Sequence, residues 1–220
     1  EARGDIVASA GDTGGDAAKD LTTFRAACLA TTNDGDTKSG DKPLRETLKR
    51  AQADVQQKAD TTPGWVAVGN AWLALAARRK EPEAAFNAEG CLEVALALDP
   101  KDIAALELEG TMLLRQHRFA AALERAESVL AIDPQRLFAL GLACDALIEL
   151  GRYEEAAKRA DTVSGLKPGP AVFARSAFFA FLSGNREKAK ADMRSALMIG
   201  RNPQQPNATA WAFAEAARMF

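Results

Sequence analysis

Apolar side chains recur at helical spacing along most of the chain, and short polar turns separate the runs. The clearest runs form two pairs, Ile103–Gln116 with Phe119–Ile132 and Leu137–Leu150 with Tyr153–Leu166. Apolar residues three and four positions apart lie on one face of an α-helix, so each run predicts an amphipathic helix. Asp133-Pro134 ends the second run, because proline cannot continue a helix. The pattern therefore predicts an all-α chain built from helix pairs.

The N-terminal part of the chain carries a weaker pattern. Ala17–Thr31 and Pro43–Ala59 are predicted helices, and the second has a thin apolar stripe. Together they form an N-terminal helical segment, 17–61, which is either a cap or a degenerate repeat. Residues 1–16, which hold several glycines and aspartates, are predicted to be a flexible tail.

The C-terminal part predicts one more helix pair and a last helix. The pair comprises Phe173–Ser183 and Arg186–Ile199, joined by a Gly-Asn turn. Asn207 can cap a C-terminal capping helix over 207–220, which would cover apolar surface at the end of a helical stack. The same helix could instead be part of a further repeat.

A repeat of 34 residues organises the middle of the chain. Asp99-Pro100, Asp133-Pro134 and Lys167-Pro168 recur at this interval. The residues 28 positions before each proline are large, and the residues 24 and 12 positions before each proline are small. Small residues let two helices approach closely, and large ones fill the grooves between helices. The three sets are Trp72, Leu106 and Leu140, then Ala76, Gly110 and Cys144, then Ala88, Ala122 and Ala156.

This helix–turn–helix unit resembles the tetratricopeptide repeat (TPR). The resemblance covers about 62–202 and implies about four units, at 62–102, 103–136, 137–170 and 171–202. It implies a right-handed α-solenoid of stacked antiparallel helix pairs, the TPR superhelix, with an extended concave face. The structural repeat positions are Trp65, Gly69, Trp72, Ala88, Pro100, Gly110, Ala122, Pro134, Cys144, Ala156 and Pro168.

Two alignments of the first unit remain open. Trp65, Gly69 and Trp72 can take the leading positions of the repeat, which requires a hairpin seven residues longer than in the other units. Alternatively, Trp72 and Ala76 take the same roles without an insertion. Seven residues make about two helical turns, so both alignments place the same face inward.

Composition excludes some classes of function. Among 220 residues, 28 are Lys or Arg and 30 are Asp or Glu, giving a net charge of −2, whereas dedicated nucleic-acid binders are usually basic. No uncharged apolar run reaches about 18 residues, so no integral membrane segment is expected. The chain begins at Glu1, not at Met, and shows no leader sequence. We expect a processed chain or a fragment of a longer protein, either cytoplasmic or exported (periplasmic) after leader removal.

The residues that usually carry chemistry are few. His117, the single histidine, lies in a predicted turn with no nucleophile near it in the sequence, so we predict no catalytic site and no enzyme. No C-x-x-C motif occurs, and we predict no cofactor and no metal. Cys144 lies among apolar residues and is predicted to be buried. Cys28 and Cys91 could form a disulfide in an oxidising compartment, although nothing in the sequence places them together.

The resemblance implies a groove, lined by the first helix of each unit, that binds peptides or partner segments. Some family members hold a terminal carboxylate there with lysine, asparagine and arginine. Glu107, Thr111, Gly141 and Asp145 stand at those positions, and we therefore expect no such clamp. The predicted partner-binding groove consists of Asn70, Glu107, Thr111, Arg115, Phe138, Asp145, Glu149, Arg175 and Phe179.

The resulting hypothesis is a protein–protein interaction module, or adaptor, that binds a protein or peptide partner in its groove. Acidic, basic and apolar side chains alternate along the predicted groove, which favours a few apolar anchors oriented by charged groups. One alternative is a self-assembling homo-oligomeric scaffold, in which Phe213 and Met219 of one copy enter the groove of another. A second alternative is an accessory domain of a larger enzyme or secretion machine.

Overall fold

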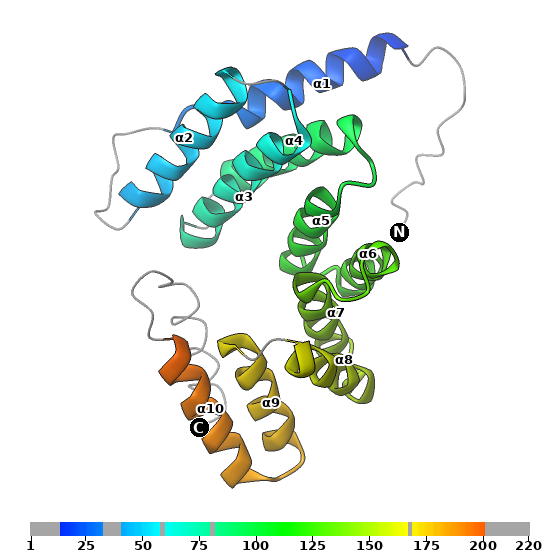
Figure 1. Ribbon diagram of the computed structural model, residues 1–220. Coiled ribbons are helices and arrows are strands. Elements are labelled where there is room, and N and C mark those ends of the chain that lie inside the picture. The colour runs from blue at the N-terminus through cyan, green and yellow to red at the C-terminus, as the bar shows by residue number, and fades with distance from the viewer. Residues whose placement is uncertain (1–13, 33–40, 58–59, 80–81, 167–168, 201–220) are drawn as a thin grey trace, which may run out of the picture. The chain divides into compact units, whose positions relative to one another are not determined.

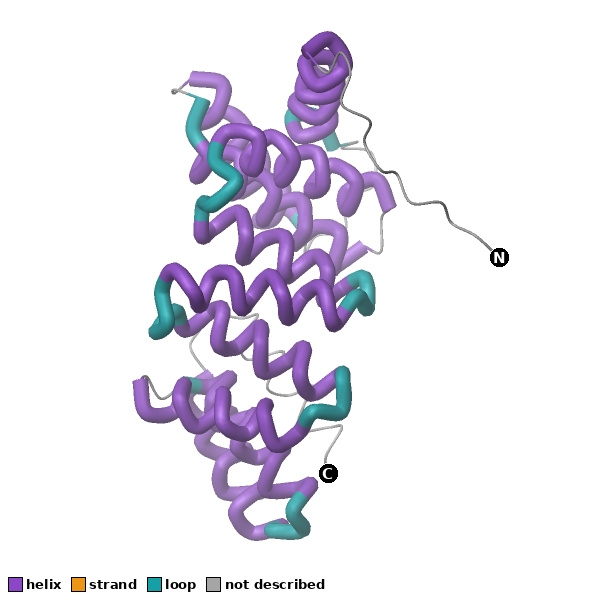
Figure 2. Tube along the Cα trace, turned by 90° about the vertical axis from the view of Figure 1, so that its right-hand side faces the viewer, coloured by secondary structure: helices purple, strands orange, loops and turns teal. Residues whose placement is uncertain are grey.

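The computed structural model describes residues 14–32, 41–57, 60–79, 82–166 and 169–200, and those residues form α-helices joined by short loops, without a strand (Figures 1 and 2). The all-α fold class is therefore confirmed. Within the described residues, no helix is long and apolar enough to cross a membrane. The helices are α1 (Gly14–Cys28), α2 (Lys42–Gln57), α3 (Thr62–Arg79), α4 (Pro82–Leu98), α5 (Ile103–Arg115), α6 (Phe119–Ile132), α7 (Leu137–Glu149), α8 (Tyr153–Leu166), α9 (Pro170–Leu182) and α10 (Arg186–Gly200).

The helices of the 34-residue repeat have nearly the predicted bounds. α6 and α8 match the prediction at both ends, and α5 and α7 each end one residue earlier. α9 begins at Pro170, three residues before the predicted start, because proline fits the first position of a helix. α1 begins at Gly14, so residues 14–16, which were predicted to belong to the tail, are helical. Pro168 and the capping helix at 207–220 lie outside the described residues.

The chain divides into two compact units, Glu1–Leu108 and Glu109–Phe220, and the division falls inside α5. In the N-terminal unit, α3 packs along α4, α1 contacts α4, and α2 contacts α3. Gly69 on α3 lies against Leu108, and a Cβ at position 69 would come within 2.8 Å of a Leu108 methyl group. Gly69 is therefore the small residue of the first unit, which supports the alignment with the longer hairpin. The extra residues lengthen both helices, since α3 has 18 residues and α4 has 17, against 13 in α5 and 14 in α6.

The C-terminal end of α1 is fixed by side chains from three other helices. Cys28 and Cys91 form a disulfide between α1 and α4, and both residues are fully buried. Trp72 Nε1 donates a hydrogen bond of 2.8 Å to the Cys28 carbonyl oxygen, and Gln52 Nε2 donates to the carbonyl oxygens of Cys28 and Ala30, both at 3.0 Å. Carbonyl groups at a helix end have no partner inside the helix, so these side chains satisfy them.

A polar cluster joins α1 to the start of α3. The Arg25 guanidinium lies 5.4 Å from the ring centre of Trp65 and pairs with Asp60. The Trp65 indole N–H also donates to Asp60. The hydrogen bond from Trp65 and the neighbouring Arg25 hold the pKa of the Asp60 carboxyl below its ordinary value.

The C-terminal unit repeats one packing contact and one turn. Leu142 on α7 occupies the space above Gly110 on α5, and Leu142 follows Leu108 by 34 residues. α5, α7 and α9 each end in a turn whose residue at positive φ is His117, Gly151 or Gly184. In each turn the next N–H donates to a carbonyl oxygen five residues earlier, as Arg118 does to Leu113 at 2.9 Å. This bond is characteristic of the Schellman motif, which ends a helix and lets the chain reverse.

Candidate functional site

A cavity of about 530 Å³ lies on the side of the C-terminal unit that α5, α7 and α9 share, and we call it the α7–α9 groove. Most of its lining is apolar, and three of its side chains are polar. The lining residues are Thr111, Leu114, Leu137, Phe138, Gly141, Leu142, Asp145, Val163, Ala171, Val172 and Arg175.

Helical spacing brings these side chains together. On α7, Phe138, Gly141 and Asp145 are three and four residues apart, so they follow one face of the helix. On α9, Val172 and Arg175 share a face in the same way. The groove is thus built on helices, which hold a binding surface more rigidly than loops do.

An ion pair connects α7 and α9 in the groove. Arg175 Nε donates to Asp145 Oδ1 at 2.8 Å, and an Arg175 Nη donates to Asp145 Oδ2 at 2.7 Å. Gly141 leaves room for this guanidinium, because a Cβ at position 141 would lie 3.2 Å from an Arg175 nitrogen. The Arg175 side chain is 12% exposed and that of Asp145 is 35% exposed. Burial disfavours the charged guanidinium, but Asp145 outweighs burial, and the pKa of Arg175 lies above its ordinary value.

The mouth of the groove is apolar and open. Phe138 is 53% exposed and Leu137 is 37% exposed, although both are large apolar residues. Because Asp145 balances the charge of Arg175 and the Arg175 side chain is 12% exposed, the groove offers a guest mainly apolar surface. The arrangement suits an apolar side chain better than a terminal carboxylate.

The structure brings four of the nine predicted groove residues to this cavity: Thr111, Phe138, Asp145 and Arg175. Phe179 instead lines a second cavity, between α8 and α9. Arg115 and Glu149 are exposed near the ends of α5 and α7 and line neither of these two cavities.

The remaining two predicted residues lie in the N-terminal unit. Asn70 is exposed on α3, whereas Glu107 is buried on α5, with 8% of its surface exposed. A buried Glu107 offers a partner little surface.

The predicted set of nine omits six apolar lining residues, Leu114, Leu137, Leu142, Val163, Ala171 and Val172. Leu142 follows the buried Leu108 by one repeat, so the 34-residue interval could have placed it beside the groove. Val163 lies on α8, the second helix of its pair, whereas the prediction used first helices alone. Nothing in the sequence pattern points to Val163.

The chemistry-bearing residues do not converge. In the described ranges, no group of three or more His, Cys, Asp and Glu side chains is placed to hold a metal ion. His117 is exposed, and its ring stacks edge-on against Phe119 at 5.5 Å. Cys144 is fully buried, as predicted, and burial raises the pKa of its thiol to about 12. A thiol in this state is a poor nucleophile at neutral pH.

Comparisons with known proteins agree with this architecture. Residues 113–175 match the family model described as tetratricopeptide repeat. A search of curated proteins found no match. A crystal structure of MamA has a TM-score of 0.53 and 14% sequence identity, and the match covers 77% of this chain and 95% of that one.

A second MamA structure, residues 41 to the end from Desulfovibrio magneticus RS-1, has a TM-score of 0.53 and 18% identity. This match covers 86% of this chain and 98% of that one. At such low identity the likeness shows the fold, which is that of a helical-repeat protein. The chain thus has an all-α helical-repeat fold in which residues 113–175 match the tetratricopeptide repeat, and these repeats support a role as a protein-interaction or scaffold module.

Proposed function

We propose that the α7–α9 groove binds a segment of a partner protein, and that an apolar side chain of this segment is its main anchor. The observation that carries the proposal is the exposure of Phe138 and Leu137 at the mouth of an apolar cavity of about 530 Å³. Ligand sites in proteins are concave, mostly apolar and fitted with a few polar groups, and the groove has each of these properties.

The Asp145–Arg175 pair supports this choice of partner. A guest carboxylate would have to compete with Asp145 for a guanidinium that is 12% exposed and donates two hydrogen bonds to Asp145. A guest with an apolar anchor leaves the pair intact and removes apolar surface from water. The polar atoms of Thr111 and Asp145 can then orient the guest backbone.

The test is selection from a displayed library of random peptides with the full chain as bait. We expect the selected peptides to share a Leu, Ile, Phe or Trp anchor. Phe138→Ala should weaken their binding about tenfold, since truncating a central aromatic anchor usually removes more than about 1 kcal/mol.

Ile132→Ala is the matched control, because Ile132 is 51% exposed and does not line the groove. Fluorescence anisotropy measures both variants after circular dichroism has shown that they are folded. Selected peptides that bind Phe138→Ala as tightly as the unchanged chain would contradict the proposal.

Self-assembly is the second candidate function. Met198 is 76% exposed and Ile199 is 49% exposed in the last turn of α10, so apolar surface remains uncovered there among the described residues. If a second copy occupies the groove, the mass in solution should rise with protein concentration, and Phe138→Ala should suppress the rise. Sedimentation of the two proteins over a hundredfold concentration range separates this scaffold from a monomeric adaptor. The accessory-domain alternative stays a prediction.

A further inference from the structure

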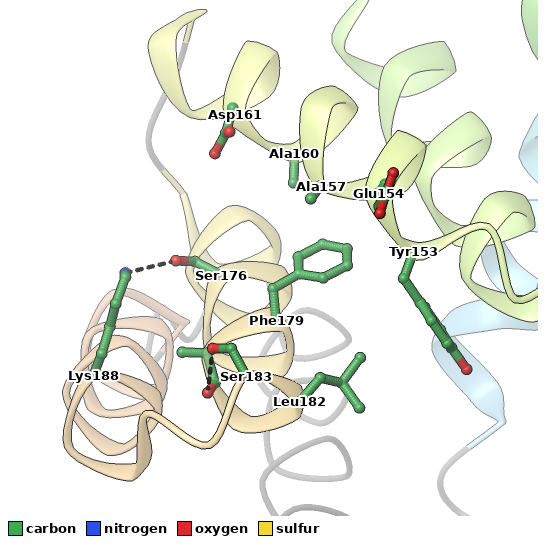
Figure 3. Close-up of a pocket in the computed structure, with 11 residues that line it drawn as sticks. Tyr153, Glu154, Ala157, Ala160, Asp161, Ser176, Phe179, Leu182, Ser183 and Lys188 are labelled. Atoms are coloured by element: carbon green, nitrogen blue, oxygen red, sulfur yellow. Dashed lines mark hydrogen bonds between the residues drawn. The ribbon is translucent and has the colours of Figure 1, made fainter.

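A second cavity, of about 690 Å³, lies between α8 and α9, and we call it the α8–α9 cleft. Figure 3 shows the Phe179 ring pointing from α9 toward Ala157 on α8, with Tyr153 and Leu182 at one end. Tyr153 is 47% exposed and Leu182 is 48% exposed. The lining residues are Tyr153, Glu154, Ala157, Ala160, Asp161, Ser176, Phe179, Ala180, Leu182, Ser183 and Lys188.

The 34-residue repeat explains why the cleft is open. α6 and α7 form the corresponding junction one repeat earlier, and they contact each other more extensively than α8 and α9 do. Leu123 on α6 and Leu142 on α7 are both buried. The residues 34 positions later are Ala157 and Ser176. Two large apolar side chains are thus replaced by small ones, and the space they would fill stays open.

An open cleft with apolar walls leaves apolar surface in contact with water, which a bound side chain would cover. Protein interiors are packed as densely as organic crystals, and uncovered apolar walls lose dispersion contacts. Phe179 and Leu182 could have been polar in a helix that merely faced water. The replacement of Leu by Ala and Ser, next to retained apolar residues, is typical of a surface that receives another side chain.

The border of the cleft is acidic. Glu154 and Asp161 are exposed on α8 and have no ion-pair or hydrogen-bond partner among the described residues. They are seven residues apart, which is about 10.5 Å along a helix. Lys188 stands on the opposite border, but it pairs with Asp192 and donates to Ser176 Oγ at 3.0 Å. The charge of Lys188 is therefore already balanced, and that of Glu154 and Asp161 is not.

We propose that the α8–α9 cleft is a second docking site, which binds a protein segment carrying an apolar anchor between two basic residues about two helical turns apart. The anchor fills the space beside Phe179 that Ala157 and Ser176 leave open. The basic residues pair with Glu154 and Asp161. The proposal does not depend on the α7–α9 groove, which is lined by other residues.

Charge argues against the chain's own C-terminal segment as the occupant. That segment offers Trp211 and Phe213 as anchors, but it has a basic residue, Arg218, close to them on one side only, and residues 202–210 on the other side hold no Lys or Arg. It also carries Glu215, whose carboxylate cannot pair with an acidic border. A foreign segment with lysine or arginine on both sides of its anchor fits better.

The test is binding of a synthetic probe to the full chain. The probe is a fluorescein-labelled alanine-based peptide of about 16 residues, long enough for partial helicity, with Leu-Phe midway between two lysines placed seven positions apart. A matched peptide carries glutamates in place of both lysines. We expect the lysine peptide to bind about tenfold more tightly, and the difference to shrink at high salt, because exposed ion pairs are weak and screened.

Protein variants locate the binding. Glu154→Gln with Asp161→Asn should reduce the preference for lysine to less than about threefold, since neither ion pair can then form. Glu83→Gln with Glu124→Gln is the control for net charge, because both residues are exposed and lie outside the cleft. Phe179→Ala should weaken both peptides, and Ile132→Ala, at an exposed position outside the cleft, should leave both unchanged. Circular dichroism checks the fold of each variant.

Three results would overturn the proposal. The first is equal or undetectable binding of the two peptides by the unchanged chain. The second is a lysine preference that persists in the Glu154→Gln, Asp161→Asn variant or is lost equally in the charge control. The third is tighter probe binding by the full-length variant Trp211→Ala with Phe213→Ala, which would mean that the chain's own segment occupies the cleft.

Discussion

In the unit that ends at Leu108, a disulfide and hydrogen bonds hold α1, a helix outside the 34-residue repeat, whereas in the unit that begins at Glu109 the helices of the repeat pack through side chains that recur at that spacing. The disulfide between Cys28 and Cys91 and the hydrogen bond from Trp72 hold α1, which lies outside the 34-residue repeat. In the other unit, the contact of Leu142 with Gly110 follows the repeat. A helix outside the repeat, such as α1, is thus held by cross-links, whereas a helix of the repeat is held by packing against the next helix.

The two units also differ in the cavities that they offer to a binding partner. Both cavities described above are lined entirely by residues of the C-terminal unit within the described ranges. There, changes of one residue within the repeat, such as Ala157 for Leu or Ser176 for Leu, open space without removing a helix. Positions that recur in each repeat thus build the helical scaffold, and positions that differ between repeats form the candidate binding sites.

Breaking the disulfide should have the largest effect. Cys28→Ser removes a cross-link between residues 63 positions apart, and the loop-entropy relation gives a loss of about 4 kcal/mol in the free energy of unfolding. Hydrogen exchange read by mass spectrometry should show lower protection in α1 and α4 and unchanged protection in α7 and α8.

The control is chemical reduction. Reduction of the unchanged chain should reproduce the variant's loss of protection, and reduction of Cys28→Ser should add nothing. Equal loss of protection in both units would refute the idea that the disulfide stabilises the N-terminal unit in particular.

Replacing Gly110, which Leu142 contacts, should have the second largest effect on the free energy of unfolding. Gly110→Ala places a methyl group where Leu142 now lies, and overpacking of this kind destabilises by about 1–3 kcal/mol. Urea unfolding and hydrogen exchange should assign the loss to helices of the C-terminal unit. Gly151→Ala is a poor control because of its positive φ, so Ala120→Gly, at an exposed helical position, serves to measure helix propensity alone. A Gly110→Ala chain as stable as the original would mean that Leu142 moves aside freely.

Much of the C-terminal unit could be predicted from the sequence, because its constraints are local and repeated. Proline, a small residue and a large residue recur at fixed distances, and they set the bounds of α5 to α8 to within one residue. The N-terminal unit offers no such repetition. The two alignments of Gly69 and Ala76 differ by two helical turns, and the contact with Leu108 decides between them.

The site was harder to predict than the fold, because it depends on contacts between helices. Asp145 and Arg175 were both predicted to line a groove, but they balance each other's charge in an ion pair. Phe179 was predicted on the same face, and it turns to the other cavity, where small residues on α8 leave room. Periodicity identifies a face of a helix, whereas the packing of neighbours decides which cavity each residue lines.

The cysteines provide a comparison of the two units in alkaline solution. Burial raises the pKa of the Cys144 thiol from 9.0 to about 12, against an opposing effect of Arg175. The unfolded chain therefore loses this proton near pH 9 while the folded chain keeps it, so the free energy of unfolding should fall by about 1.4 kcal/mol per pH unit between these values. Cys28 and Cys91 do not titrate in the disulfide and add no such slope.

Urea unfolding at pH 8 to 11 measures this slope, and Cys144→Ala should flatten it. Comparing slopes, rather than absolute stabilities, removes the effect of the small cavity that alanine leaves. An identical slope in the variant would assign the alkaline loss to lysine or tyrosine.

The smallest expected effect concerns the turn that ends α5. His117 adopts φ 59° at a position where the turns after α7 and α9 have Gly151 and Gly184 at φ 73° and 78°. A residue with a Cβ is strained there, so His117→Gly should stabilise the chain by about 0.5 kcal/mol, with part of the relief offset by the greater entropy of glycine in the unfolded state. The His117 ring also loses its contact with Phe119, which keeps the gain small.

Urea midpoints followed by circular dichroism can resolve a change of this size when Gly151→Ala is measured beside it, since that variant introduces the strain that His117→Gly removes. Stabilisation by His117→Gly together with destabilisation by Gly151→Ala would show that the positive φ angle has the same effect on stability in these turns. Destabilisation by both would mean that the ring contact outweighs the strain. In that case the first turn of the C-terminal unit would be held by a side chain, in the manner of the N-terminal unit, rather than by its backbone alone.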